Sequence, residues 1–201
     1  ILLLMLIRYP VALSIPSDRG LHNKPIATSG GLAIFLGIST ILITTHNTNL
    51  IVLLILASMI TFTGLLDDKY NLSVTTRFII QIMLFIIFFG YNLIDMTKNA
   101  YIFILFVFIS TYMINIFNFM DGIDLLATLQ TIFTFAALQI ILYNDISTIP
   151  NIIEIMNFTI ITLASFLLFN KSPAKIFLGN SGSYLLGFLI ISVFYLIITN
   201  N

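Results

Sequence analysis

Cysteine is absent from the 201 residues, and charged side chains make up only 8% of them. The absence of cysteine excludes disulfide bonds and thiolate metal sites. Soluble domains carry about 25% charged residues, so the low charge, together with 59% hydrophobic residues, indicates a membrane protein. Eight basic and eight acidic side chains cancel, so net charge points to neither nucleic acid nor an acidic partner.

Long apolar runs replace the missing charge. After a stub at 1–7, they cover 30–45, 50–66, 78–91, 100–119, 125–143, 152–169 and 184–199. They lack the period-2 alternation of a membrane barrel, and in hydrocarbon only helices then satisfy the backbone. The predicted fold class is all-α, a polytopic transmembrane helical bundle with one partial and about seven full spans and both termini outside.

The stub is far shorter than the roughly 20 residues of a span, and the first residue is not Met. Residues 1–201 are therefore expected to form a single integral-membrane domain that is truncated at both ends. No basic start followed by a small-residue cleavage site, as in a secretory signal, is visible.

Alternating the connections between the two membrane faces sorts the charge. One set holds Arg8, Arg19, Lys24, Lys69, Arg77, Lys171 and Lys175, and the other holds only Lys98. Because cytoplasmic loops carry the excess of Lys and Arg, the first set is predicted to be cytoplasmic. The unusual polar residues fall in the same set, whereas a transporter would place them near the midplane. This distribution favours chemistry on a cytosolic solute and a lipid headgroup.

Two adjacent carboxylates, Asp67 and Asp68, close the run at 50–66 in "GLLDDKYNLS". Neighbouring side chains on a helix diverge by about 100°, so the two are predicted to serve different partners, one a metal and the other a substrate. The alternative is that both are simply solvated at a membrane exit.

"NIFNFMDGIDLLA" carries Asn115, Asn118, Asp121 and Asp124 at a spacing of three. This spacing predicts one helical stripe, provided that Gly122 does not break it. Oxygen ligands of this kind suit magnesium. The asparagines could equally be helix caps, but polar residues inside a membrane are costly and usually functional.

Two further segments are candidates for phosphate binding. "PAKIFLGNSGSYLLG" is predicted to be a glycine-rich loop before a helix, whose N–H groups could hold a phosphate; a plain turn is an alternative. "SDRGLHNKPIATSGG" holds basic side chains that could grip phosphates or merely set topology. The candidates from these segments are Arg19, His22, Lys24, Lys175, Gly179, Ser181 and Gly182. Lys69, Arg77, Asn115 and Asn118 are the further residues predicted to bind substrate or phosphate.

In this order, the four motifs resemble the polyprenyl-phosphate N-acetylhexosamine-1-phosphate transferases, relatives of phospho-N-acetylmuramoyl-pentapeptide transferase. "NFMDGID" is more similar to the branch that uses simple UDP-N-acetylhexosamines. The resemblance implies transfer of a sugar 1-phosphate from a UDP-sugar to polyprenyl phosphate, with release of UMP, at the cytoplasmic face of a bacterial plasma membrane. The implied cofactor is Mg²⁺, with Mn²⁺ as an alternative, and a homodimer is left open.

The resemblance assigns catalytic roles to Asp67, Asp68, Asp121 and Asp124, and metal binding to Asp67, Asp68 and residue 180. Three departures stand against activity. Asn180 occupies the position of the family's metal-binding aspartate, Leu125 replaces a usual glycine, and the chain ends before the family's histidine-rich loop. An inactive relative that still holds a polyprenyl phosphate or a nucleotide is therefore the alternative.

Overall fold

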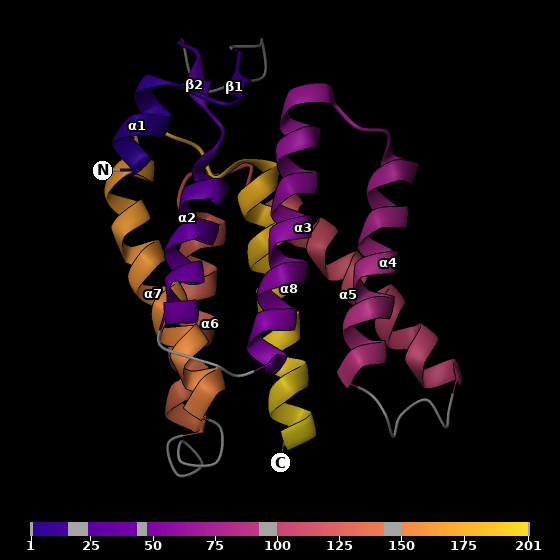
Figure 1. The fold of residues 1–201 in the computed structure, drawn as a ribbon. Helices are drawn as coiled ribbons and strands as arrows, with labels where there is room; N and C mark the ends of the chain where they lie inside the picture. Colours follow the sequence, from indigo (N-terminus) through magenta and orange to yellow (C-terminus); the bar gives the residue numbers. More distant parts are fainter. Residues whose placement is uncertain (1, 16–23, 44–47, 93–99, 143–149, 201) are drawn as a thin grey trace.

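The computed structural model describes residues 2–15, 24–43, 48–92, 100–142 and 150–200. Helices dominate these residues, as predicted (Figure 1). They are α1 (Leu2–Arg8), α2 (Gly30–Ser39) with the 3₁₀ turn η1 (Thr40–Ile43), α3 (Thr48–Tyr70), α4 (Val74–Asn92), α5 (Ala100–Met120), α6 (Leu126–Ile141), α7 (Pro150–Asn170) and α8 (Gly179–Asn200). The all-α class of the prediction is confirmed.

Five helices of the described chain, α3, α4, α5, α7 and α8, are long and apolar enough to cross a membrane. The other two predicted full spans, α2 and α6, have 10 and 16 residues and fall short of the roughly 20 that a span needs. Five helices, rather than the predicted seven or so, are therefore long enough to span a membrane in the described chain. The orientation of the termini stays a prediction.

Helix α8 is the centre of the bundle. It packs against α2, α3, α5, α6 and α7. In the 18-residue apolar stretch of α8, 78% is buried, compared with 28% in the corresponding stretches of α4 and α5. Small residues allow the closest approaches: a Cβ on Gly31 would meet the backbone of Gly182, and one on Gly64 would meet the backbone of Ser181. Small residues at such crossings let membrane helices pack backbone to backbone.

Aromatic side chains attach the outer helix α4 to this centre. Phe85 and Phe88 of α4 lie 5.5 and 5.7 Å from Phe188 of α8, measured between ring centroids. Phe89 lies 5.0 Å from Tyr195 in an edge-to-face arrangement. Such pairs contribute about 0.5–1.5 kcal/mol beyond the area that they bury. These rings fix the C-terminal half of α4 beside α8, whereas the start of α4 is joined to α8 by the hydrogen bond from Arg77 to Tyr184 at 3.3 Å.

A small β-hairpin, which was not predicted, covers one end of the bundle, and each of its strands has only two residues. Strands β1 (Leu13–Ser14) and β2 (Ile26–Ala27) pair antiparallel. Ala27 also forms a parallel bridge with Ile176. In Figure 1 the hairpin lies at the opposite end of the bundle from the C-terminus. The hairpin therefore ties the segment before α8 to the start of α2.

Candidate active site

The segments predicted to share one membrane face meet at the hairpin end of the bundle, as far as the structure describes them (Figure 1). Gly30 at the start of α2 donates its N–H to the carbonyl of Phe177, at 3.1 Å. Asn170 at the end of α7 accepts the N–H of Leu125 at 3.2 Å through Oδ1. Three connections that are far apart in the sequence are thus hydrogen-bonded to one another.

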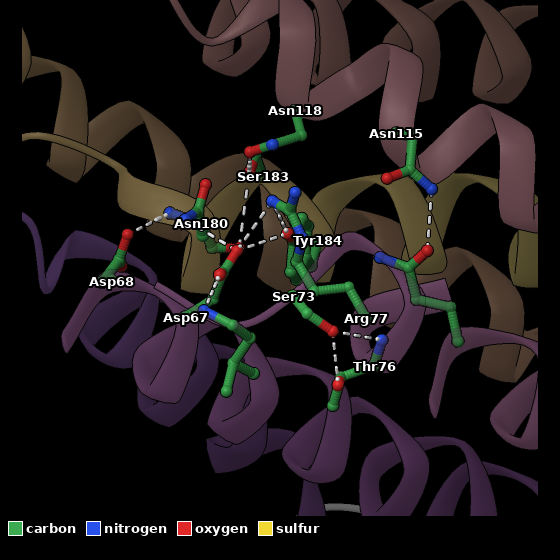
Figure 2. Close-up of polar contacts among 12 residues, drawn as sticks. Asp67, Asp68, Ser73, Thr76, Arg77, Asn115, Asn118, Asn180, Ser183 and Tyr184 are labelled. Atoms are coloured by element: carbon green, nitrogen blue, oxygen red, sulfur yellow. Dashed lines mark hydrogen bonds and ion pairs between the residues drawn. The ribbon is translucent and has the colours of Figure 1, made fainter. Parts of the chain in front are cut away.

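Asp67 lies at this end of α3, buried among protein donors (Figure 2). Its Oδ2 accepts hydrogen bonds from Tyr184 Oη at 2.7 Å, Asn180 Nδ2 at 3.0 Å and Arg77 Nη1 at 3.1 Å. Its Oδ1 accepts the N–H of Leu72 at 2.9 Å. Only 3% of Asp67 is exposed, so the alternative of a solvated carboxylate is wrong for this residue.

Asp68 points to the start of α8 instead. Its Oδ1 accepts the N–H of Asn180 at 3.0 Å and its Oδ2 that of Ser181 at 3.5 Å. A carboxylate at a helix N-terminus satisfies otherwise unpaired N–H groups and complements the helix dipole. Asp67 and Asp68 thus accept from different groups of the chain, although both contact Asn180. The expectation that one serves a metal and the other a substrate stays a prediction.

The glycine-rich segment is not a loop before a helix at 184, because α8 begins at Gly179. Gly179 has φ +73°, and a Cβ there would meet Thr28 O and Asp68 Oδ2. Ser181 is fully buried, and Gly182 packs on Gly31 and Leu178. The predicted N–H groups therefore exist, but a carboxylate of the chain already accepts those of residues 180 and 181.

The predicted stripe on α5 holds for its first two residues. Asn115 Nδ2 donates to Gln81 Oε1 at 2.7 Å and to the carbonyl of Thr111 at 2.8 Å. Asn118 Oδ1 accepts from Ser183 Oγ at 2.7 Å. Both asparagines thus bridge helices, and the alternative of helix caps is wrong.

The stripe ends where α5 ends, at Met120. Asp121 still donates its N–H to Phe117, at 3.2 Å. Residues 121–125 form turns, in which Asp124 is exposed. Leu125 there has φ +71°, a left-handed conformation that costs a non-glycine residue about 1–2 kcal/mol. The usual glycine of the family therefore has a conformational reason at this position.

The basic candidates do not form one group. Arg77 contacts Asp67 and Tyr184, and 24% of its side chain is exposed. Lys24, Lys69 and Lys175 are exposed. Arg19 and His22 lie outside the described residues. Arg77 is therefore a partner of a buried carboxylate, and the three lysines are the described candidates that face solvent.

Three side chains of this site were missed in the sequence: Gln81, Ser183 and Tyr184. Gln81 follows Arg77 by four residues, and Tyr184 follows Asn180 by four, so each lies on the same helical face as a predicted residue. Both Gln81 and Tyr184 are fully buried. Helical spacing from the candidates already chosen could have found them.

Asp121 lies outside the spanning helices. Burial, and then the neighbouring charges of Asp68 and Asp124, raise the pKa of Asp121 from 3.8 to about 8. Desolvation and like charge both disfavour the ionised carboxylate. The ionised form of Asp121 is therefore less favoured near neutral pH than that of a free aspartate.

A pH dependence of stability follows for Asp121. Because its folded pKa is raised, its contribution to stability is complete below about pH 4 and is lost as the pH rises to about 8. We expect the thermal midpoint in detergent to fall over this range, and to fall less steeply in Asp121→Asn. An unchanged slope in Asp121→Asn, relative to the original protein, would contradict this assignment.

The predicted metal ligands do not fit a cation as they are arranged. Asp67 already accepts four protein donors, one of them the cationic Arg77. Asn180 directs its amide N–H, rather than its oxygen, at Asp67. Among the described residues, no group of three His, Asp or Glu side chains is placed to hold a metal ion. Magnesium stays a prediction, and Asp67 with Asn180 is not the pair that would bind it here.

A family model described as glycosyl transferase family 4 matches residues 50–198. This match covers α3 to α8, and with them every described carboxylate of the site. The chain belongs to glycosyl transferase family 4. The family that the four motifs indicated is thereby confirmed.

Three curated relatives illustrate the similarity of this chain to known proteins. A probable undecaprenyl-phosphate N-acetylglucosaminyl 1-phosphate transferase of Bacillus subtilis is 29% identical over 87% of this chain and 52% of its own length. A phospho-N-acetylmuramoyl-pentapeptide-transferase of Nautilia profundicola is 30% identical over 87% of this chain and 61% of its own. A putative UDP-N-acetylglucosamine–dolichyl-phosphate N-acetylglucosaminephosphotransferase of Saccharolobus solfataricus is 32% identical over 84% and 59%. The chain spans about half the length of the curated relatives it matches.

Proposed function

We infer that this protein transfers a sugar 1-phosphate, namely an N-acetylhexosamine 1-phosphate, from a UDP-sugar to polyprenyl phosphate and releases UMP. The observation that carries the proposal is that the family motifs converge at one end of the bundle. Asp68 binds the start of α8, and its charge acts on Asp121 of the turn after α5. The names of the relatives supply the substrate class.

The reaction would be a single displacement at phosphorus. A phosphate oxygen of the lipid attacks the phosphorus that bears the sugar, and the bond from this phosphorus to UMP breaks. A phosphomonoester, with a second pKa of about 6, is mostly dianionic at neutral pH, so a strong general base is not required. Most of the barrier is then positioning and charge neutralisation. The four donors that contact Asp67, and its burial, argue against an aspartyl-phosphate intermediate on that residue.

Residues of the chain can meet part of this demand. The exposed Lys24, Lys69 and Lys175 provide positive charge for the pyrophosphate and the lipid phosphate. Asp121 has a pKa raised to about 8, and its protonated form can donate a hydrogen bond to a sugar or phosphate oxygen. Asp68 fixes the N-terminus of α8 beside these groups. The magnesium that the family implies would add charge neutralisation, but no step of this proposal depends on it.

The proposed location is the cytoplasmic leaflet of a bacterial plasma membrane, where the product would begin a cell-envelope glycan such as an O-antigen or a teichoic acid linkage unit. The distribution of Lys and Arg supports this orientation, with seven of the eight basic residues in the connections of one face. The membrane itself and its lipids are the immediate surroundings of the exposed apolar faces of α4 and α5.

The proposal is tested by UMP release from UDP-N-acetylglucosamine with undecaprenyl phosphate, in detergent, by the intact protein. We expect Asp68→Asn to lower the rate by at least about 100-fold, since positioned electrostatic groups contribute effects of that size. Glu154→Gln, the same chemical change in the first turns of α7, should leave the rate within about twofold.

A second function, binding without turnover, is favoured by one observation. Asn180 satisfies Asp67 with an amide where the family has a further carboxylate. If the intact protein releases no UMP from any UDP-N-acetylhexosamine, yet retains radiolabelled undecaprenyl phosphate, the transferase proposal fails and this second function stands.

A further inference from the structure

Asp67 is held by donors from four separate positions. Arg77 comes from α4, Asn180 and Tyr184 come from α8, and Leu72 comes from the loop that follows α3. Figure 2 shows the three side chains converging on one carboxylate oxygen. We call Asp67 with these four partners the Asp67 clamp. It joins the end of α3 to the starts of α4 and α8.

The clamp leaves little capacity for a metal ion. An ionised carboxylate offers about four lone-pair sites, two on each oxygen. Three donors crowd Oδ2 of Asp67, and Oδ1 accepts one further N–H. The guanidinium of Arg77, 3.1 Å from Oδ2, already balances its charge and would repel a second cation. Because only 3% of Asp67 is exposed, a donor that a metal displaced from it would lose its acceptor at a place that water hardly reaches.

The orientation of the Asn180 amide follows from its partner. A carboxylate can only accept, so the group at 3.0 Å from Asp67 Oδ2 must be the Nδ2 donor. The backbone N–H of Asn180 simultaneously donates to Asp68. A carboxylate at position 180 would instead place two acceptors against each other in a buried site, where like charges raise the free energy unless a cation or a proton lies between them.

We propose that Asp67 is neutralised by the chain itself and is a positioning residue rather than a metal ligand, and that the uncharged amide of Asn180 keeps it so. The clamp holds α3, α4 and α8 in register, so that Asp68 and the N–H groups of residues 180 and 181 stay together. A negative charge at position 180 converts the buried pair into a site that requires a divalent cation. This proposal concerns cation binding and stability, and it stands whether or not the protein transfers sugar phosphates.

The experiment compares the thermal unfolding of the intact protein in detergent in two buffers, one with MgCl₂ and one with EDTA. About 10 mM MgCl₂ is used, because this concentration would nearly saturate a site with a millimolar dissociation constant. We expect the original protein to show no more than about 1 °C of difference. Asn180→Asp should unfold at a lower temperature in EDTA and recover at least half of the loss in Mg²⁺. Asn71→Asp, the same charge change on the exposed loop after α3, should respond equally in both buffers.

Two outcomes would overturn the proposal. One is stabilisation of the original protein by Mg²⁺ that Asp67→Asn abolishes, because Asp67 would then bind the cation. The other is an Asn180→Asp variant that folds but gains nothing from Mg²⁺. If Asn180→Asp does not fold, Tyr184→Phe replaces it: removal of one clamp donor should lower the unfolding temperature equally in both buffers, and a loss that Mg²⁺ restores would refute the clamp.

Discussion

Replacing Arg77 with methionine is expected to lower the free energy of unfolding by about 3 kcal/mol, since it leaves the buried Asp67 carboxylate without its counter-charge. Breaking a buried ion pair costs more than breaking a surface pair because the remaining charge cannot return to water. The estimate is at the low end of the usual range because 24% of the Arg77 side chain is exposed. Unfolding in detergent, followed by circular dichroism against denaturant, measures the change.

Lys69→Met is the matched control, because Lys69 is an exposed cation at the same end of the bundle, 5.3 Å from the Tyr70 ring. Its loss should stay within about 0.5 kcal/mol, as for most surface substitutions. The double variant Asp67→Asn with Arg77→Met should lose less than the sum of the two single variants, since no stranded charge remains. Equal losses for Arg77→Met and Lys69→Met would show that the ion pair does not stabilise the fold.

Substituting alanine for Gly64 is expected to destabilise the protein by about 3 kcal/mol. The added Cβ would fall on backbone atoms of Asn180 and Ser181, and backbone cannot rotate away as a side chain can. Overpacking of a well-packed interior costs about 1–3 kcal/mol, and the rigid neighbour places this case at the upper end. The same displacement would separate Asp68 from the N–H of Asn180, so activity or ligand retention should fall as well.

Gly90→Ala provides the comparison. Gly90 lies in α4, and a Cβ added there would meet no atom within 4 Å beyond its own helix backbone. Alanine is favoured over glycine in a helix by up to about 1 kcal/mol. Stability should be unchanged or slightly raised. A Gly64→Ala protein as stable as Gly90→Ala would mean that α3 and α8 do not approach as closely as the structure has them.

The fold class and much of the site could be predicted from local patterns. Long apolar runs dictate helices in a membrane, and a polar residue among them is costly wherever it lies. Asp67, Asp68, Asn115 and Asn118 were found for that reason, and all four form polar contacts between helices. The left-handed conformation of Leu125 could also be predicted, because the resemblance to the family implies a glycine at this position and glycine often adopts that conformation.

The first and last residues of the helices were harder to predict, because the length of an apolar run does not indicate where the helix begins or ends. The run predicted at 184–199 extends back to Gly179, where Asp68 satisfies the first N–H groups of α8. The runs at 30–45 and 125–143 gave helices that are too short to span by length.

The sequence alone determined that this chain is helical, membrane-embedded and polar at a few costly positions, because hydropathy and periodicity are local properties. Only the tertiary structure decided which polar groups meet. Asp67 and Asp68 are neighbours with the same chemistry, yet one is enclosed by Arg77, Tyr184 and Asn180 and the other holds a helix N-terminus. That difference depends on how α3, α4 and α8 pack, since Asn180 and Tyr184, more than 100 residues away, supply donors to these carboxylates.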